Sequence, residues 1–354
     1  MAPTASSASP GPTQGPQVLC LGEALVDRLG PPGGDPASDG PCDDRLGGAP
    51  ANVACALARL GTPSAFLGRL GRDAIGSAFR ELFVARGVDT TALQWDAQRP
   101  SRIVLVRRNV EGDRQFGGFA GDRGAGFADQ ALDAPELSAA LRPLLASAGW
   151  LLVGTIPLAS PGAASALRLA LREAAAAGVP LALDVNWRPT FWDPAADPTS
   201  GPTAAQVAAM RPLLEQAALI KCAREEAEWL LGTADPAVAG AGLPQRPAVL
   251  ITDGAAPLRW WLGGVAGELP AFPVPAVDTT GAGDAFTAGL LHGLLRGEWP
   301  RLPHDPAPAE RVRQLMHFAS ACGALVCLGA GAIDPQPNAA EVEDFLAGQT
   351  SFCR

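Results

Sequence analysis

The residues best suited to chemistry lie in the run Asp278-Thr279-Thr280-Gly281-Ala282-Gly283-Asp284, where small residues precede an apolar stretch. Small side chains leave backbone N–H groups uncovered, so a ligand can come close to the main chain. The sequence that follows predicts a helix that begins near Gly281 and ends by Gly297 and Pro300. The free N–H groups and the positive end of the helix dipole at such a terminus favour an anion such as phosphate.

Asp284 places a carboxylate in the first turn of this predicted helix. A carboxylate at that position can simply cap the helix. Beside a phosphate-binding backbone it can instead act as a general base, which takes the proton from a hydroxyl group that attacks a phosphoryl group. The residues alone leave both roles open.

This heptapeptide resembles the second signature of the ribokinase-like sugar kinases, also called the phosphofructokinase B family. The resemblance implies that the backbone of Gly281, Ala282 and Gly283 forms an anion hole for the transferred phosphate. It also implies that Asp284 deprotonates the sugar hydroxyl. The chain is thus expected to be an ATP-dependent carbohydrate kinase that uses Mg²⁺.

The N-terminal part of the sequence extends the resemblance. Residues 18–21 predict a buried parallel strand, after which Asp27 alone would fit a solvated loop acid. The later Gly-Gly turn leads into a helix, and GGAPANVACALARLG resembles the first signature of the same family. The resemblance implies that Asp27, Gly47, Gly48 and Asn52 contact the sugar.

A small β-sheet is expected beside the main domain. Residues 103–119 alternate as two strands around a turn, which predicts a hairpin. In the resembled family such a hairpin forms part of a lid over the sugar, so residues 23–45 and 101–120 are the expected lid segments. Phe116 or Phe119 would then close on the sugar, and the lid is a candidate contact for a homodimer.

Strand and helix patterns alternate in the second half of the chain. Residues 151–184 predict a strand, a helix and a parallel strand joined by a right-handed crossover. The polar run 184–188 then lies at the carboxyl end of a strand, where α/β sheets place ligands. It resembles the family's D-x-N-x-R motif, which implies Asn186 near the ATP phosphates and Arg188 near the sugar or a phosphate. An exposed loop arginine is the alternative for Arg188.

Two further segments resemble the nucleotide side of the family. Residues 219–226 resemble its K-x-N-x-x-E pattern, with Ala223 in place of the Asn or Ser, and 252–254 resemble a T-x-G turn. The implied nucleotide contacts are Lys221, Glu226, Thr252 and Gly254, together with Gly281 and Gly283. An acidic helix start is the alternative explanation of Glu226. A potassium-type ion is a further family-level expectation near Asp278, Thr280 and Gly331.

Composition sets the limits of these readings. The net charge of −9 argues against nucleic-acid and anionic-membrane surfaces, which leaves small molecules as the expected partners. Seven cysteines without a CxxC pair suit free thiols in the cytoplasm. The resulting expectation is a ribokinase-like three-layer α/β/α domain over residues 18–348, with a mainly parallel sheet and a β-sheet lid. Residues 1–17 are expected to be a disordered leader and 349–354 a tail.

The substrate remains a choice among sugars. The opening GEALVD and the D-x-N-x-R-P-x-x-W segment resemble fructokinases most, which implies that D-fructose is converted to fructose 6-phosphate. A 2-keto-3-deoxygluconate kinase, or another sugar or nucleoside kinase of the family, is the alternative. That branch uses a Tyr-rich strand, which a chain without tyrosine cannot supply. A catalytically silent, kinase-like binding protein is the alternative from a different class.

Overall fold

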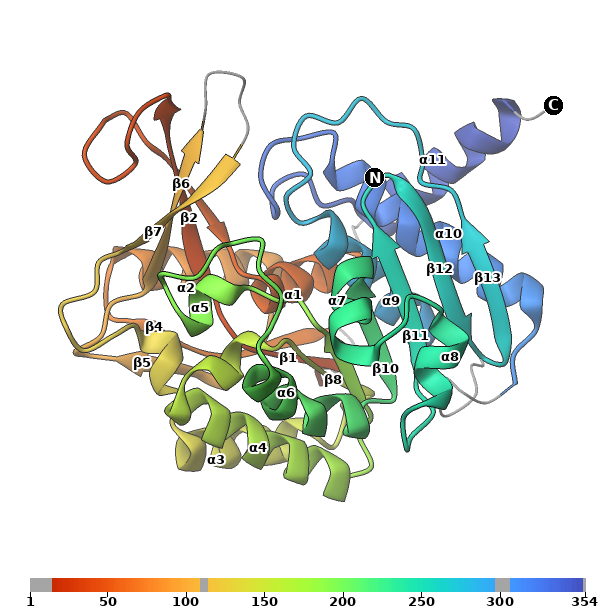
Figure 1. The fold of residues 1–354 in the computed structure, drawn as a ribbon, viewed down its shortest axis with the longest axis horizontal. Coiled ribbons are helices and arrows are strands. Elements are labelled where there is room, and N and C mark those ends of the chain that lie inside the picture. The colour runs from red at the N-terminus through yellow and green to blue at the C-terminus, as the bar shows by residue number, and fades with distance from the viewer. Residues whose placement is uncertain (1–14, 109–113, 297–305, 353–354) are drawn as a thin grey trace, which may run out of the picture.

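The computed structural model describes residues 15–108, 114–296 and 306–352 (Figure 1). Its main sheet has nine strands in the order β13-β12-β11-β10-β9-β8-β1-β4-β5. Their bounds are β1 Val18–Leu21, β4 Ser64–Gly71, β5 Leu93–Asp96, β8 Trp150–Val153, β9 Leu181–Asp184, β10 Leu219–Ala223, β11 Ala248–Asp253, β12 Ala256–Leu262 and β13 Val265–Leu269. Every neighbouring pair from β11 to β5 is parallel, whereas β12 and β13 pair antiparallel. The predicted mainly parallel sheet is confirmed, and β13, which was not predicted, forms one edge of it.

Helices cover both faces of this sheet. Their bounds are α1 Ala49–Arg59, α2 Ala74–Arg86, α3 Ala134–Leu144, α4 Pro161–Ala176, α5 Pro189–Trp192, α6 Ala204–Gln216, α7 Arg224–Leu231, α8 Pro236–Ala241, α9 Ala282–Leu295, α10 Ala309–Val326 and α11 Ala339–Phe352. Short 3₁₀ turns occupy Ala128–Ala131 and Ile156–Ala159.

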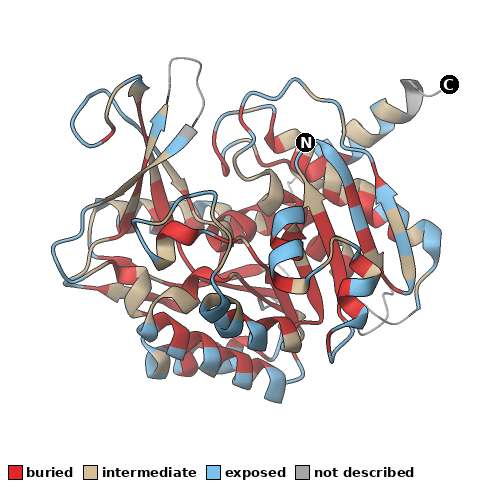
Figure 2. Cartoon of the chain, viewed as in Figure 1, coloured by how far each residue is buried: buried red, intermediate tan, exposed pale blue. Residues whose placement is uncertain are grey.

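Alternation along the central strand explains the layers. In β1, Val18 and Cys20 join the apolar core under α1, α2, α9 and α10, whereas Leu19 and Leu21 join the core under α3, α4 and α6. All four residues are fully buried, as expected for a parallel strand with helices on both faces. Figure 2 shows buried residues along the sheet and exposed ones on the outer sides of the helices. The predicted α/β/α architecture is therefore confirmed.

The second sheet has the order β3-β2-β6-β7 and projects from the main domain (Figure 1). Its strands are β2 Leu25–Pro32, β3 Asp43–Gly47, β6 Arg102–Arg108 and β7 Arg114–Ala120. The predicted hairpin is the antiparallel pair β6–β7, and β2 joins it in parallel next to β6. The predicted turn at 110–113 lies outside the described residues. These strands come from the two expected lid segments, so the small lid sheet is confirmed.

The chain ends differ in detail from the expectation. Residues 1–14 of the predicted leader lie outside the described part, whereas Gln17 donates a backbone hydrogen bond to Pro63 and accepts one from Gly149, both 2.8 Å. α11 continues to Phe352, so the predicted tail begins with helical residues. α9 ends at Leu295, and the predicted stop signals Gly297 and Pro300 lie outside the described residues.

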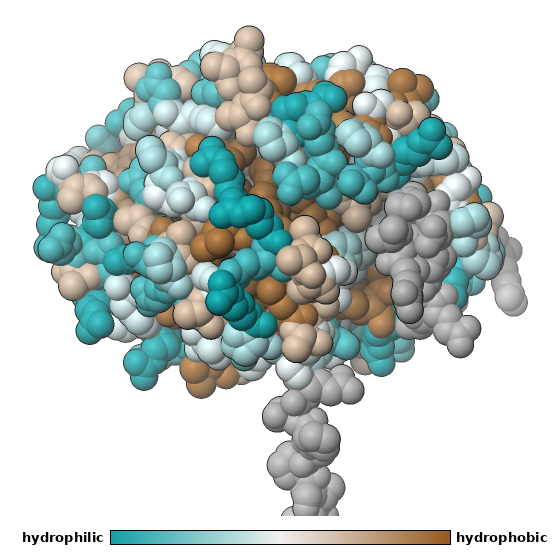
Figure 3. Space-filling model, turned by 90° about the horizontal axis from the view of Figure 1, so that it is seen from below, coloured by the Kyte–Doolittle hydropathy of each residue, from teal (hydrophilic) through white to brown (hydrophobic). Residues whose placement is uncertain are grey.

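Surface and core show no sign of a membrane span in the part that is described. None of the helices in residues 15–108, 114–296 and 306–352 combines the length and the apolar character needed to cross a bilayer. Polar and apolar side chains mix on the face seen from below (Figure 3). Six cysteines are described and all are free thiols.

Candidate active site

The start of α9 forms the tight turn that the sequence predicts. Gly281 is the residue before the helix, with φ of +80°, and a Cβ there would lie 2.6 Å from the Cβ of Ala332. Both the left-handed backbone and the close contact require glycine. Ala282, Gly283 and Asp284 therefore occupy the first helical turn, where the N–H groups have no partner within the helix.

A cation lies directly beside this turn. A Cβ on Gly283 would be 2.9 Å from the Nζ atom of Lys221, which comes from β10. The absence of a side chain at 283 therefore gives the ammonium group access to the helix N-terminus. The predicted anion site thus combines backbone N–H groups with a positive charge.

Asp284 is held by Asn52 from the N-terminal half of α1. The Nδ2 atom of Asn52 donates to Oδ2 of Asp284 over 2.7 Å, and Asn52 itself is buried. Burial and the charge of Asp184 raise the pKa of Asp284 to about 6, although the Asn52 hydrogen bond and the charges of Lys221 and Arg188 oppose the rise. A carboxylate with this pKa is ionised at neutral pH and can still accept a proton, as a general base requires.

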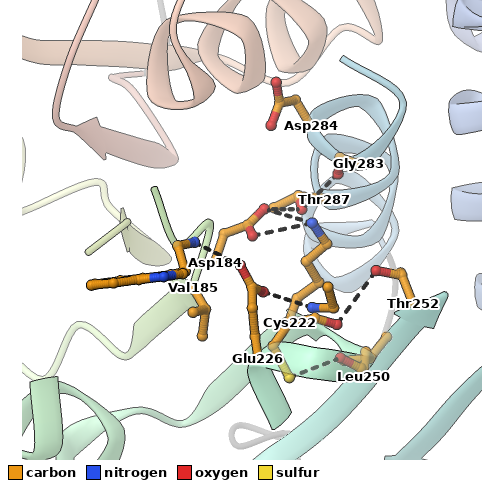
Figure 4. Close-up of polar contacts among 12 residues, drawn as sticks. Asp184, Val185, Cys222, Glu226, Leu250, Thr252, Gly283, Asp284 and Thr287 are labelled. Atoms are coloured by element: carbon orange, nitrogen blue, oxygen red, sulfur yellow. Dashed lines mark hydrogen bonds and ion pairs between the residues drawn. The ribbon is translucent and has the colours of Figure 1, made fainter. Parts of the chain in front are cut away.

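A second carboxylate, Asp184, lies at the end of β9 below this turn (Figure 4). Lys221 Nζ donates to its two oxygens over 3.1 and 3.2 Å, and the hydroxyl of Thr287 donates to Oδ2 over 2.8 Å. The same hydroxyl contacts the carbonyl of Gly283 over 3.0 Å. Asp184 therefore fixes the lysine and the first turn of α9 relative to each other.

Glu226 braces two backbone segments. Its Oε1 accepts from the N–H of Trp187 over 2.6 Å, and its Oε2 accepts from the N–H of Ala223 over 2.7 Å (Figure 4). The side chain is buried, and desolvation raises its pKa although both hydrogen bonds and Lys221 favour the charged form. Glu226 thereby fixes the loop with Asn186, which adopts a positive φ of +43°.

The predicted sugar contacts gather on the other side of Asp284. Built on Gly47, a Cβ would lie 3.2 Å from Oδ2 of Asp27 and 4.0 Å from Oδ1 of Asn52. Gly48 has φ of +104°, and a Cβ there would lie 2.7 Å from the carbonyl oxygen of Glu23. These four residues therefore converge, and Asn52 connects them to Asp284.

Glu23 supports this group from the end of β1. Its Oε1 accepts from the N–H of Ala49 at the start of α1 over 3.2 Å. The side chain is buried, and this burial raises its pKa to about 8, with the charges of Asp129 and Asp284 acting in the same direction and hydrogen bonds from backbone N–H groups opposing them. Glu23 thereby helps to fix the helix that carries Asn52.

Aromatic side chains and an ion pair form a further wall. Arg102 and Asp129 are both buried, with N–O distances of 2.8 and 3.0 Å. The guanidinium lies 4.8 Å from the ring centroids of Phe119 and Phe191. The predicted contact residue Phe119 therefore lies in a wall whose buried arginine is neutralised. Phe116 packs edge-on against Phe119 at 5.0 Å.

The remaining nucleotide-side predictions lie at neighbouring strand ends. Thr252 is the penultimate residue of β11, and its hydroxyl donates to the carbonyl of Cys222 over a long 3.4 Å, whereas Gly254 is exposed with φ of +54°. Arg188 is exposed and donates to the carbonyl of Trp187 over 2.9 Å, while its charge reaches Asp284. These residues therefore lie near the carboxyl ends of β9 and β11, the two strands that flank β10 with Lys221.

Asp278, Thr280 and Gly331 also come together. Asp278 Oδ1 accepts from the backbone N–H and the hydroxyl of Thr280 over 3.0 and 2.6 Å. Its Oδ2 accepts from the N–H of Gly331 over 2.8 Å and from Nη1 of Arg45 over 3.1 Å. The expected ion ligands are therefore neighbours, and an arginine shares their carboxylate.

Several residues of the site were not assigned a role from the sequence. Asp184 opened a recognised motif, and its place at the end of a predicted strand was the available signal. Thr287 follows Asp284 by three positions, so the helical period placed both on one face but gave no indication of a role for Thr287. Glu23 stands in the GEALVD opening and Arg45 at the end of the predicted lid segment 23–45, but neither position indicated a role for the side chain.

Comparison with known proteins shows the family of the chain. A sequence model described as pfkB family carbohydrate kinase matches residues 16–339. A fructokinase from Klebsiella pneumoniae is 33% identical over 337 residues, which cover 93% of this chain and 99% of that protein.

Solved structures give the same result. The fructokinase with bound ATP from Xylella fastidiosa is similar with a TM-score of 0.78 at 29% identity, covering 94% of this chain and 99% of that one. A double mutant of the fructokinase from Vibrio cholerae, in its fructose-, ADP- and potassium-bound form, has a TM-score of 0.73 at 26% identity with the same coverage. Because the family match spans nearly the whole chain, the protein belongs to the pfkB family of carbohydrate kinases and is a sugar kinase.

Proposed function

We propose that the protein transfers the γ-phosphoryl group of ATP to the hydroxymethyl group of D-fructose, which gives fructose 6-phosphate. The observation that carries this proposal is the position of Asp284. It lies in the first turn of α9, held by Asn52 on the sugar side, with Lys221 at the neighbouring Gly283. A base, a cation and the N–H groups of a helix N-terminus thus meet at one point.

In the proposed reaction, the sugar side of the site activates the hydroxyl group and the nucleotide side stabilises the phosphate charge. Asp284 takes the proton of the hydroxymethyl group, whose oxygen bonds to the γ-phosphorus as the bond to the ADP oxygen breaks. The N–H groups at Gly281, Ala282 and Gly283 and the ammonium of Lys221 stabilise the negative charge that moves onto phosphate oxygens. Asp184 and Thr287 keep Lys221 in place for this task.

Mg²⁺ is the proposed metal cofactor, and it would neutralise charge on the phosphates. The described residues contain no group of three or more His, Cys, Asp or Glu side chains that could hold a metal. Mg²⁺ nevertheless commonly binds through one or two carboxylates together with substrate phosphates and water. Asp184 and Glu226, both beside Lys221, supply suitable oxygen chemistry. Asn186, Thr252 and Gly254 are the proposed nucleotide contacts around them.

The arginines favour a neutral ketose over an acid sugar. A bound carboxylate needs several converging donors to offset its desolvation. Arg102 is paired with Asp129 in the aromatic wall, and Arg123 is exposed. Arg188 acts on Asp284 and is the one arginine among the proposed sugar contacts. The fructokinase names of the relatives point to the same substrate.

An ADP-release assay tests the proposal directly. The substrates would be fructose, ribose, 2-keto-3-deoxygluconate, adenosine and fructose phosphates, each at saturating Mg-ATP. We expect the highest kcat/KM for fructose. A higher value for 2-keto-3-deoxygluconate would overturn the fructose assignment but keep the kinase mechanism, whereas no turnover with any sugar would support the silent binding protein.

Location and assembly complete the proposal. The free thiols support a location in the cytoplasm, which is a reducing compartment. The projecting lid sheet supports a homodimer contact, which sedimentation of the purified chain would test.

A further inference from the structure

Arg45 connects the lid to the loop that precedes α9. It lies on β3 of the lid sheet, and its Nη1 atom is 3.1 Å from Oδ2 of Asp278, a residue far along the chain. The Asp278 side chain is only 4% exposed, and that of Arg45 is 26% exposed. The ion pair is therefore largely shielded from water. Shielded charges interact more strongly than charges at the protein surface.

The Asp278 carboxylate is fully used. A carboxylate has about four acceptor positions on its two oxygens. Oδ1 accepts hydrogen bonds from the N–H and the hydroxyl of Thr280, and Oδ2 accepts them from the N–H of Gly331 and the guanidinium of Arg45. Gly331 thus donates its N–H group to Oδ2 of Asp278. Together these contacts leave no acceptor position on Asp278 for a metal ion.

We propose that the guanidinium of Arg45 takes the place of a monovalent cation beside the anion hole, so that this kinase works without potassium. The inference rests on the function proposed above for the same site. Arg45 supplies the positive charge that balances Asp278, and the balanced Asp278 fixes the turn that runs through Thr280 into Gly281. Arg45 is thus a positioning residue, because it acts on the anion hole through Asp278.

The surroundings of Arg45 suit a permanent charge. Its Nε donates to Asp43 over 2.8 Å, and its Cδ would lie 3.5 Å from a Cβ built on Gly331. The hydrogen bond to Asp43, together with the charges of Asp43, Asp278 and Asp334, raises the pKa of Arg45 despite partial burial. The guanidinium therefore fills the space between the lid strand and the loop at 331, and it keeps its charge at every working pH.

Kinetics in different salts test this assignment. With about 0.1 M KCl replaced by tetramethylammonium chloride at equal ionic strength, we expect kcat of the wild-type enzyme to change less than about twofold. Arg45→Met should lower kcat about tenfold with little change in the KM of the sugar, and potassium should restore part of the loss. Arg45→Lys should keep more activity than Arg45→Met, because it retains a charge. Arg28→Met is the matched control, since Arg28 pairs with Asp44 on the outer part of the same lid sheet.

Several results would overturn the proposal. These are strong potassium activation of the wild type, an Arg45→Met enzyme as fast as the wild type without potassium, or an Arg45→Met enzyme that potassium does not accelerate.

A stability measurement separates this assignment from the proposed reaction. Loss of the arginine leaves Asp278 buried without its cation, so Arg45→Met should have a lower Tm that potassium raises, whereas potassium should leave the wild-type Tm unchanged. A potassium-dependent Tm of the wild type would refute the assignment. If no sugar is phosphorylated by the wild type, the proposed function fails, but this thermal comparison still decides the role of Arg45.

Discussion

The two carboxylates beside the start of α9 are held in different ways. Asp284, on the sugar side, accepts a hydrogen bond of 2.7 Å from the neutral amide of Asn52. Asp184, on the nucleotide side, binds the ammonium of Lys221 over 3.1 and 3.2 Å (Figure 4). An amide partner leaves a carboxylate able to take a proton near neutral pH, whereas a cation partner balances its charge. In the proposed reaction, the same residue type thus serves proton transfer at Asp284 and charge placement at Asp184.

The largest expected effect comes from removing the base. Asp284→Asn keeps the shape of the side chain but cannot accept the proton, so kcat should fall by a factor on the order of 10² or more. ATP binding, measured by calorimetry, should persist because the nucleotide side is intact. Asp44→Asn, on the exposed lid surface, is the control. Near-normal turnover of the Asp284 variant would remove the functional difference between the two carboxylates.

Removing the cation tests the other half of the comparison. Lys221→Met leaves Asp184 buried and unbalanced, so the free energy of unfolding in urea should fall by about 3 kcal/mol. Adding Asp184→Asn should restore much of this stability but not the turnover, because the ammonium beside Gly283 is still missing. Full activity of the double variant would show that the ion pair is only structural.

A sugar-side change should affect one substrate alone. Asp27 lies beside Gly47 and Asn52, away from the strand ends of the nucleotide side. Asp27→Ala should therefore raise the KM for fructose by about tenfold, as expected for a lost hydrogen bond to a charged group, with little change for ATP. Initial rates with each substrate varied in turn provide the measurement, and equal increases in both KM values would contradict the division into two sides.

The smallest effect concerns pH. Since the pKa of Asp284 is raised to about 6, kcat/KM should increase with pH through that value as the base loses its proton. The amide of Asn52 favours the charged carboxylate, so Asn52→Ala should move this midpoint upward by about one unit. A pH profile with an unchanged midpoint would mean that Asn52 acts on the sugar only.

Local sequence determined the turn at α9 and most of the layers. Gly281 requires a positive φ, and the apolar residues after it repeat with the period of a helix, so both features are visible in neighbouring residues. The alternation of strand and helix patterns likewise predicted the parallel sheet. Recognition of the two signature segments then indicated Asn52 and Asp284 as members of one site, and the K-x-N-x-x-E pattern added Lys221.

The tertiary structure alone decided which partner each charged group has. Asp184 meets Lys221 and Thr287 across 37 and 103 residues of chain, and Arg45 meets Asp278 across 233. Such pairs depend on which strand ends lie side by side and on how the lid strand approaches the loop before α9. Sequence periodicity describes only which face of an element a residue occupies. The pKa of Asp284 and the cation beside Asp278 therefore follow from the fold, because burial and neighbouring charges set them.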